Sequence, residues 1–285
     1  MVQVLASSWG SPPITEAGTV AAWLLLGVAI ASVAGALIFA AGLVIAKDRE
    51  TSVLFWLVTA GALVVFSFYV EPWLDFIGAT TYLTNVFDPV VTIVDRPIPW
   101  HVVLTYSGGI APATIVAYLI IKQGRSATVL FAWAAFISVA ECIGEMISCH
   151  YGVMLYYSNN ALVLGIPMPS LVQNGGMFVL IGWAMAAMLP HLHGWRRIVV
   201  VPFIAPAVYL AYTLLCTLPS YYAIHNNASS AVSWTLAIVS TALNLGAVIF
   251  AGYAPTVTRL REAAQSGNTA KHTVAKSVQK TEAPA

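Results

Sequence analysis

Charged residues are scarce in this chain of 285 residues. Only 8% of the residues are Asp, Glu, Lys or Arg, whereas 59% are hydrophobic, and the mean hydropathy is +0.83. Soluble globular domains carry roughly 25% charged residues, so the composition excludes a water-soluble domain. The net charge is only +1, and the basic residues are spread along the chain, which excludes nucleic acid as a partner.

Cysteine is also rare. Its three occurrences fall in apolar segments, so we interpret them as small buried side chains and not as a disulfide or metal framework. The chain lacks the GxxxxGK[ST] phosphate loop, the HExxH zinc motif, CxxC and GxSxG. We therefore expect neither a metal nor a cofactor. Because no apolar segment has a lysine in its interior, a retinal protein with a Schiff base is excluded as well.

The chain contains several long apolar segments. A helix needs about 20 residues to cross a hydrocarbon core of about 30 Å. Seven segments meet this length, at residues 20–46, 51–70, 100–122, 127–149, 167–190, 197–218 and 230–254. The predicted fold class is therefore all-α, a polytopic membrane protein built as a bundle of about seven transmembrane helices.

The basic residues define an orientation for this bundle. Seven crossings put eleven of the twelve Lys and Arg residues on one side, and only Arg96 on the other. By the positive-inside rule the N-terminus lies outside and the C-terminus is cytoplasmic. We expect a short outer segment at 1–19, the transmembrane domain at 20–260 and a disordered cytoplasmic tail at 261–285. The predicted location is a cell membrane, most simply a bacterial plasma membrane.

Two glutamates lie four residues apart in the fourth segment, ISVAECIGEMISCHYGVMLYY, at residues 137–157. A charged side chain at this depth is costly. At about 100° per residue, the polar residues of this helix fall within an arc of about 120°. These residues are Ser138, Glu141, Cys142, Glu145, Ser148 and Cys149. We therefore expect this face to point into the bundle or into a cavity inside it.

Further polar residues are predicted at the outer ends of neighbouring spans. The second span ends at Glu71, the third begins at Trp100 and His101, and the fifth carries Gln173 and Asn174 near its outer start. An outward-facing pocket could unite them with the helix-four glutamates. The candidate catalytic residues are Glu145, Glu141, Asp75 and Asp88. The candidate substrate-binding residues are Glu71, Tyr82, Trp100, His101, Tyr151, Gln173 and Asn174.

The chemistry of such a pocket follows from its ionisation. Two carboxyl groups one helical turn apart in an apolar site cannot both be charged at low cost, so one is expected to remain a neutral acid. A neutral carboxyl beside an ionised one can act as a general acid–base pair. The same groups could instead hold the bundle together by pairing with Arg96 or a histidine, and acids in the 71–99 loop could simply face water.

Three stretches of the sequence together form a further pattern: EPWLDFIGATTYLTNVFDPVVTIVDRPIPW, AECIGEMISCHYGVMLYY and VLGIPMPSLVQNGGM. They form an acidic, aromatic segment after the second span, a glutamate-bearing helix, and an entry to the next span rich in Gly and Pro. This layout resembles the AveC-like spirocyclase family of actinobacterial membrane proteins, over roughly residues 55–190. The resemblance implies cyclisation of a dihydroxy-ketone polyketide to a spiroketal with loss of water, a reaction of secondary metabolite biosynthesis.

The central stretch is also similar to membrane carotenoid hydratases and transmembrane terpene cyclases, which implies protonation of a lipophilic substrate. The predicted function is therefore a membrane-embedded cyclase acting on a lipophilic polyketide- or terpenoid-type substrate. The alternatives are a terpene or carotenoid cyclase or hydratase, a proton-coupled transporter of a small lipophilic molecule, and a structural subunit. The expected partners are a lipophilic small molecule and the lipid bilayer; the sequence leaves the oligomeric state open.

Overall fold

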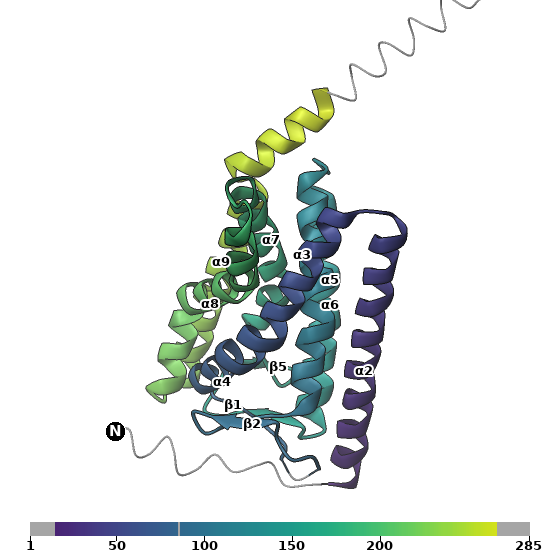
Figure 1. Cartoon of the computed structure of the whole chain (residues 1–285). Helices are drawn as coiled ribbons and strands as arrows, with labels where there is room; N and C mark the ends of the chain where they lie inside the picture. The colour runs from purple at the N-terminus through teal and green to yellow at the C-terminus, as the bar shows by residue number, and fades with distance from the viewer. Residues whose placement is uncertain (1–14, 85, 267–285) are drawn as a thin grey trace, which may run out of the picture.

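Helices dominate the computed structural model of the chain, which describes residues 15–84 and 86–266 (Figure 1). Within this part, seven helical segments are long and apolar enough to cross a membrane. This confirms the predicted all-α polytopic bundle. The segments are α2 (Glu16–Ile45), α3 (Arg49–Gly61) continued by η1 (Ala62–Val70) and α4 (Glu71–Gly78), α5 (Trp100–Lys122), α6 (Ala127–His150), α7 (Ser170–Met188) with η2 (Leu189–His191), α8 (Trp195–His225) and α9 (Ser230–Gly252).

Helix α7 forms the centre of the bundle. It packs against α5, α6, α8 and α9, and it is the most buried of the seven spans. Helix α2 lies at the periphery, where it packs mainly on α5 (Figure 1). Its outward side chains, such as Leu24 and Ile38, are apolar and exposed, as expected of a helix that faces lipid.

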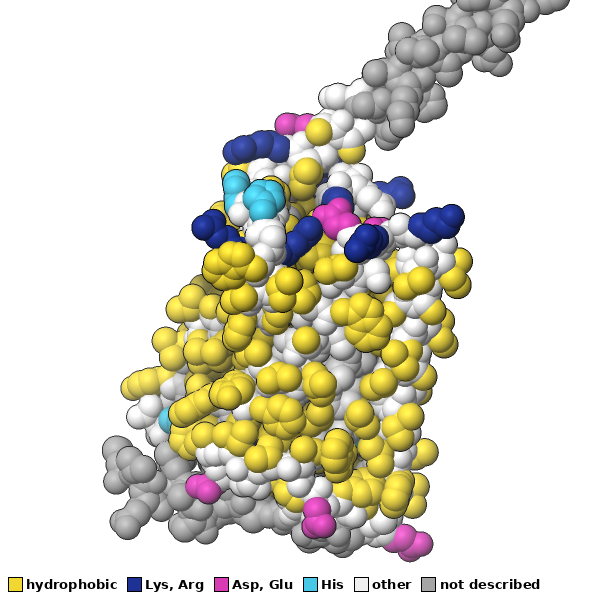
Figure 2. All heavy atoms as spheres, viewed as in Figure 1, with side chains coloured by type: hydrophobic (Ala, Val, Ile, Leu, Met, Phe, Trp, Pro, Cys, Tyr) yellow, Lys and Arg dark blue, Asp and Glu magenta, His cyan; other side chains and the backbone are white. Residues whose placement is uncertain are grey.

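The two ends of the bundle differ in charge. Figure 2 shows a broad belt of hydrophobic side chains between two polar ends: Lys and Arg gather, together with some acidic side chains, at the end from which the C-terminal helix projects, whereas the opposite end shows acidic side chains and no Lys or Arg on this face. This agrees with the charge asymmetry from which the orientation was predicted. By the positive-inside rule, the basic end is the cytoplasmic one, and the opposite end is called the outer end below.

The second span is longer than predicted. The sequence placed its end at residue 70, but the helix continues to Gly78 and takes Glu71 and Asp75 with it. The intervening η1 is a π-helix, in which the Glu71 N–H donates to the carbonyl of Phe66, five residues earlier. Pro72 follows directly and has no N–H to donate, so the regular ladder is already interrupted where the wider turn forms.

Short strands close the outer end of the bundle, where the sequence predicted only loops. Strand β1 (Thr80–Tyr82) pairs with β4 (Met154–Tyr156), β2 (Val91–Ile93) with β3 (Arg96–Ile98), and β5 (Leu162–Val163) with β6 (Ile166–Pro167), all antiparallel. The β1–β4 ribbon joins the segment after the second span to the segment after the fourth. It therefore fixes two distant parts of the chain over the helix ends.

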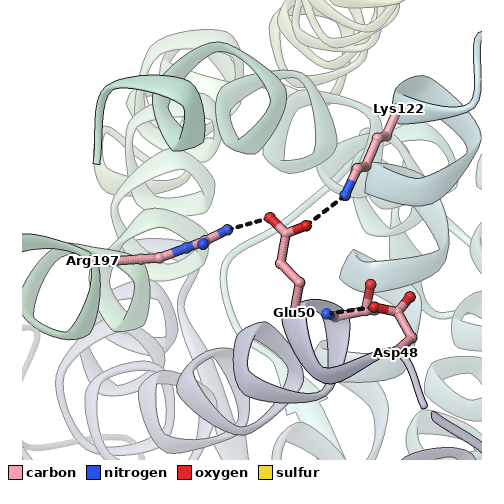
Figure 3. A network of polar contacts seen from close by, with 5 residues as sticks. Asp48, Glu50, Lys122 and Arg197 are labelled. Carbon is pink, nitrogen blue, oxygen red and sulfur yellow. Dashed lines mark hydrogen bonds and ion pairs between the residues drawn. The ribbon is translucent and has the colours of Figure 1, made fainter. Parts of the chain in front are cut away.

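At the cytoplasmic end, one carboxylate links three helices. Glu50 of α3 accepts from Lys122 of α5 at 3.0 Å and from Arg197 of α8 at 2.8 Å (Figure 3). Asp48 caps α3 by accepting from the N–H of Thr51 at 3.1 Å. Hydrogen bonding from Thr51 holds the pKa of Asp48 below its ordinary value. The Glu50 pairs are half-exposed, so each contributes only about 1 kcal/mol or less to stability.

The ends of the chain differ in part from the predicted divisions. Helix α2 begins at Glu16, within the predicted outer segment 1–19, of which residues 1–14 lie outside the described part. Residues 255–266 are helical, so the predicted tail at 261–285 begins inside a helix. The Arg261 guanidinium donates to the carbonyl of Arg125 and ties this helix to the α5–α6 turn. The rest of the tail lies outside the described residues.

We predict that Gly175→Ala separates α6 from α7 and destabilises the bundle by about 1–3 kcal/mol. A Cβ at position 175 would run into the carbonyl of Ala134 and into Ser138. Thermal unfolding in detergent measures the effect. Gly246→Ala in α9 is the matched control, because an added Cβ there has no neighbour within 4 Å. Equal unfolding temperatures for the two variants would contradict this close approach.

Candidate functional site

A cavity of about 100 Å³ lies at the outer end of the bundle, between α4, α5, α6, α7 and α8. Three carboxyl groups and five tyrosines line it, and no lysine, arginine or histidine does so among the described residues. The carboxyl groups belong to Glu71, Asp75 and Glu145. The tyrosines are Tyr82, Tyr106, Tyr156, Tyr209 and Tyr221. The cavity is thus acidic and rich in hydroxyl groups inside an otherwise apolar bundle.

Glu71 is held by two tyrosines. The Tyr82 hydroxyl donates to its Oε1 at 2.7 Å, and the Tyr106 hydroxyl donates to its Oε2 at 2.6 Å. Both oxygens of this buried carboxyl group therefore accept short hydrogen bonds, an arrangement that suits the ionised form. Glu71 is anchored in one position and has little freedom to reach a ligand.

The β1–β4 ribbon forms the outer wall of the cavity. In its register Thr80 faces Tyr156 and Tyr82 faces Met154. Side chains of directly paired residues, and of residues two apart, lie on the same face of such a ribbon. All four of these residues line the cavity. Pairing between β1 and β4 therefore delivers two tyrosines to the site from loops about 70 residues apart.

Glu145 and Asp75 differ from Glu71 because each has an oxygen without a partner. Tyr156 donates to Oε1 of Glu145 at a long 3.4 Å, while the buried Oε2 has no hydrogen-bond partner. Oδ2 of Asp75, a residue only 4% exposed, is likewise buried without a partner. Buried polar atoms are usually satisfied. Two unsatisfied carboxyl oxygens in the walls of one cavity leave hydrogen-bonding capacity for a ligand.

Glu141 does not share this cavity. It lines a smaller neighbouring cavity of about 60 Å³ between α5, α6 and α7, together with Glu145. Its side chain is also exposed on the outer surface of the bundle. The predicted polar stripe is therefore only partly internal: Ser138, Cys142 and Ser148 are buried, whereas Glu141 lies at its edge. Glu145, Tyr106, Asn174 and Tyr209 line both cavities and separate them.

The other predicted site residues divide into two groups. Gln173 and Asn174 line the main cavity as predicted, and both are 8% exposed. Asp88, Trp100 and Tyr151 are exposed and line neither cavity.

Asp88 follows Phe87 in the segment between β1 and β2, where it is exposed as loop acids commonly are, so the structure does not bring it to the cavity that holds Asp75 and Glu145. His101 stands behind the cavity, with its ring 5.7 Å from that of Tyr82.

Helix α8 supplies residues that the sequence reading missed. Tyr209, Thr213, Thr217 and Tyr221 line the cavity from this helix at intervals of four residues. Residues spaced by four lie on one helix face, so this polar stripe was the available signal in an apolar span.

The stripe holds Gln173 in place. Its amide N–H donates to Thr213 at 3.2 Å, and its carbonyl accepts from Thr217 at 2.9 Å. The amide of this central-helix residue is thereby fixed at the cavity wall.

The ribbon tyrosines are fixed as hydrogen-bond donors. Burial raises the pKa of Tyr82 well above its ordinary value, and the negative charges of Asp75 and Glu71 add to the effect. Burial acts in the same way on the pKa of Tyr156, reinforced by Glu145. Both hydroxyl groups therefore keep their protons at neutral pH.

Arg96 is the basic residue associated with this end of the molecule. It lies in β3, is 4% exposed and stands over the ring of Phe76 at 5.7 Å. Burial lowers its pKa, while the charges of Asp75 and Asp95 oppose this effect. Arg96 thus acts electrostatically on Asp75 but does not line the cavity. Asp75 therefore has a cation in its surroundings.

The described residues contain no group of three or more His, Cys, Asp and Glu side chains arranged to hold a metal ion. The chain matches no family model, no curated protein and no solved structure. What the site can do must therefore be inferred from its own geometry.

We predict that Tyr106→Phe and Tyr82→Phe each destabilise the protein by about 1–3 kcal/mol. Each change leaves one oxygen of the buried Glu71 without its donor, and an unsatisfied buried group carries a cost of this size. Thermal unfolding in detergent is the measurement. Tyr222→Phe, at a side chain that is 62% exposed, serves as the control. Variants as stable as this control would show that the Glu71 contacts are not formed.

Proposed function

We propose that this protein is a membrane-embedded cyclase that uses carboxyl groups as general acid and general base on a lipophilic, oxygen-bearing substrate. The seven apolar helices indicate that the protein lies in a membrane. Its assignment to a bacterial plasma membrane, with the acidic cavity opening away from the cytoplasm, is part of the proposal. The product class proposed is a cyclic ether or ketal, and the reaction belongs to secondary metabolite biosynthesis.

The observation that carries the proposal is the pair of unpartnered oxygens, Glu145 Oε2 and Asp75 Oδ2, at one enclosed cavity. A charged carboxylate with a buried oxygen that lacks a donor is costly, and we assign the neutral acid to Glu145, which has no basic residue beside it in either cavity. A neutral carboxyl has one O–H to give, and here that O–H has no protein acceptor. A substrate oxygen placed in the cavity would be its acceptor.

The surroundings suit the two carboxyl groups to different roles. Glu145 has no basic residue beside it in either cavity, which favours the neutral acid. Arg96 acts electrostatically on Asp75, and we assign the general base to Asp75 because it is the lining carboxyl group on which a basic residue acts. Pairs of titratable groups in such unequal environments are a common basis for acid–base catalysis.

A dihydroxy ketone illustrates the proposed chemistry. Glu145 donates its proton to the ketone oxygen as a substrate hydroxyl attacks the carbonyl carbon, and Asp75 accepts the hydroxyl proton, which gives a hemiketal. Asp75, now protonated, donates its proton to the hemiketal hydroxyl, which leaves as water. The second substrate hydroxyl adds to the resulting oxocarbenium carbon and gives its proton to the Glu145 carboxylate, so both groups return to their starting forms. The products are a spiroketal and one water molecule, without a redox change. The resemblance to the AveC-like spirocyclase family implies this reaction. Membership of the chain in that family is part of the proposal.

We predict that Glu145→Gln and Asp75→Asn each slow cyclisation about 100- to 10,000-fold, the usual contribution of a general acid or base. The assay offers a long-chain dihydroxy ketone to the purified protein in detergent, and mass spectrometry follows the loss of water. Unfolding temperatures are recorded for the same samples. Asp88→Asn is the matched control, because Asp88 is exposed and lines neither cavity; its rate should stay within about twofold of wild type.

Three results would contradict the proposal. A Glu145→Gln variant that is folded and equally active excludes Glu145 as the acid. A variant that loses its fold indicates a structural role for the carboxyl group. If the protein shows no turnover in detergent but moves a lipophilic molecule across liposomes in response to a pH gradient, the carboxyl groups serve proton coupling in a transporter.

A further inference from the structure

A large apolar groove runs along the outside of the bundle beside the carboxyl cavities. It lies between the outer half of α2 and the end of α6, has a volume of about 580 Å³, and is lined mainly by aliphatic side chains. Leu24, Leu25 and Val28 form its α2 wall, and Ile147 and Tyr151 its α6 wall. Since α2 is the peripheral helix and its outward side chains are apolar and exposed, the groove opens on the outside of the bundle, on a surface of the kind expected to face lipid.

The groove reaches the depth of Glu141. Gly18 of α2 lies against the backbone carbonyl of Tyr151 at the outer end of α6. Ten residues farther toward the cytoplasm on each helix, about 15 Å at 1.5 Å per residue, are Val28 on α2 and Glu141 on α6. Val28 is a groove residue, and Glu141 lines the smaller cavity.

Successive positions around helix α6 connect the groove with the carboxyl group of Glu145. At about 100° per residue, Ile147, Gly144, Glu141 and Glu145 follow one another at intervals of roughly 40–60°. Ile147 belongs to the groove, Glu141 to the smaller cavity, and Glu145 to both cavities. Gly144 therefore occupies the step between the groove and the first carboxyl group.

The space beside Gly144 is not filled by side chains. A Cβ added at Gly144 would have no neighbour within 4 Å, and the same holds for Gly109, which lines the smaller cavity from α5. Helices α5 and α6 also make few contacts with each other compared with α6 and α7. The side chain of Glu141 is exposed in this gap. A charged group at a lipid-facing surface is costly, and a polar ligand group would satisfy it.

The volumes indicate which kind of molecule fits. Pockets that enclose a drug-sized ligand usually measure about 300–1,000 Å³, whereas the two carboxyl cavities measure about 100 and 60 Å³. They hold a ketone or hydroxyl group with its neighbouring carbons but no long chain. The groove, at about 580 Å³, has the size and the apolar lining for that chain.

We infer that the α2–α6 groove and the gap at Gly144 form a lateral entrance, through which a long-chain molecule with an oxygenated head passes from the outer leaflet to Glu145, its tail remaining in the groove. This inference rests on the proposed function for the identity of the head group. Glu141 is a positioning residue at the entrance, which guides the head group past the gap toward Glu145.

A photo-crosslinking experiment tests the entrance without requiring turnover. The full-length protein in lipid nanodiscs is incubated with a long-chain ketone that carries a diazirine beside the carbonyl, irradiated, and mapped by mass spectrometry. In wild type we expect adducts on the α7 peptide that contains Asn174 and Met177. Gly144→Trp, which fills the gap, should reduce this labelling at least about tenfold, while Gly144→Ala should leave it unchanged.

A second blocking variant, Val28→Trp, keeps the test decisive if Gly144→Trp does not fold; we call the two the plug variants. Val28→Trp enlarges a side chain on the α2 wall that is 66% exposed, so the fold should tolerate it, and it should reduce labelling severalfold. Val44→Trp, at a side chain that is 65% exposed on α2 outside the groove, is its control. Undiminished labelling of α7 in folded plug variants overturns the entrance. If the plugs block labelling but wild type never cyclises the dihydroxy ketone, the entrance stands and the proposed function fails.

Discussion

The placement of three carboxyl groups around one cavity within the bundle, with no basic side chain among the described residues that line it, is the constraint on which this structure depends. Such groups cannot all be ionised in a medium of low dielectric constant without large cost. The protein meets this constraint unequally. Glu71 receives two tyrosine hydroxyl groups, whereas Asp75 and Glu145 each keep one oxygen without a partner, and Arg96 acts electrostatically on Asp75. We base the different roles proposed for these carboxyl groups on this inequality.

Two local departures from a simple helical bundle build the cavity. The π-helix η1 precedes Pro72 and allows the second span to continue as α4, which carries two of the carboxyl groups into the interior. The β1–β4 ribbon then closes the outer end and adds two tyrosines. Both elements interrupt regular structure next to the reactive groups, where strained or irregular backbone commonly accompanies function.

The sequence predicted the bundle well because apolar length and the distribution of basic residues are both local signals. It also predicted that Glu145, Gln173 and Asn174 face one outer pocket, since depth along a span follows from topology. It misplaced Glu71 and Asp75 at the boundary of a loop, because a π-helix followed by proline reads as a helix end. Asp88 lies outside the cavity, and the sequence cannot show which loop acids turn inward. Tyr106 and Tyr156 joined the site through tertiary packing and strand pairing, which no local pattern encodes.

The path from lipid to Glu145 extends this account from the cavity to the surrounding membrane. An added Cβ at Gly144 or Gly109 would have no neighbour within 4 Å, and Ile147 of the groove lies three residues from Gly144 on α6. A site that admits its substrate from the bilayer has no need of a wide opening to water. This agrees with the small volume of the carboxyl cavities and with the ribbon that covers them.

Infrared difference spectroscopy of the wild type and Glu145→Gln in nanodiscs at neutral pH tests the central claim most directly. The account predicts that the wild-type spectrum contains the carbonyl stretch of a neutral carboxylic acid in an apolar environment, and that this band disappears in the variant. If the variant instead loses only the bands of an ionised, solvated carboxylate, Glu145 is not a buried acid and the account is wrong.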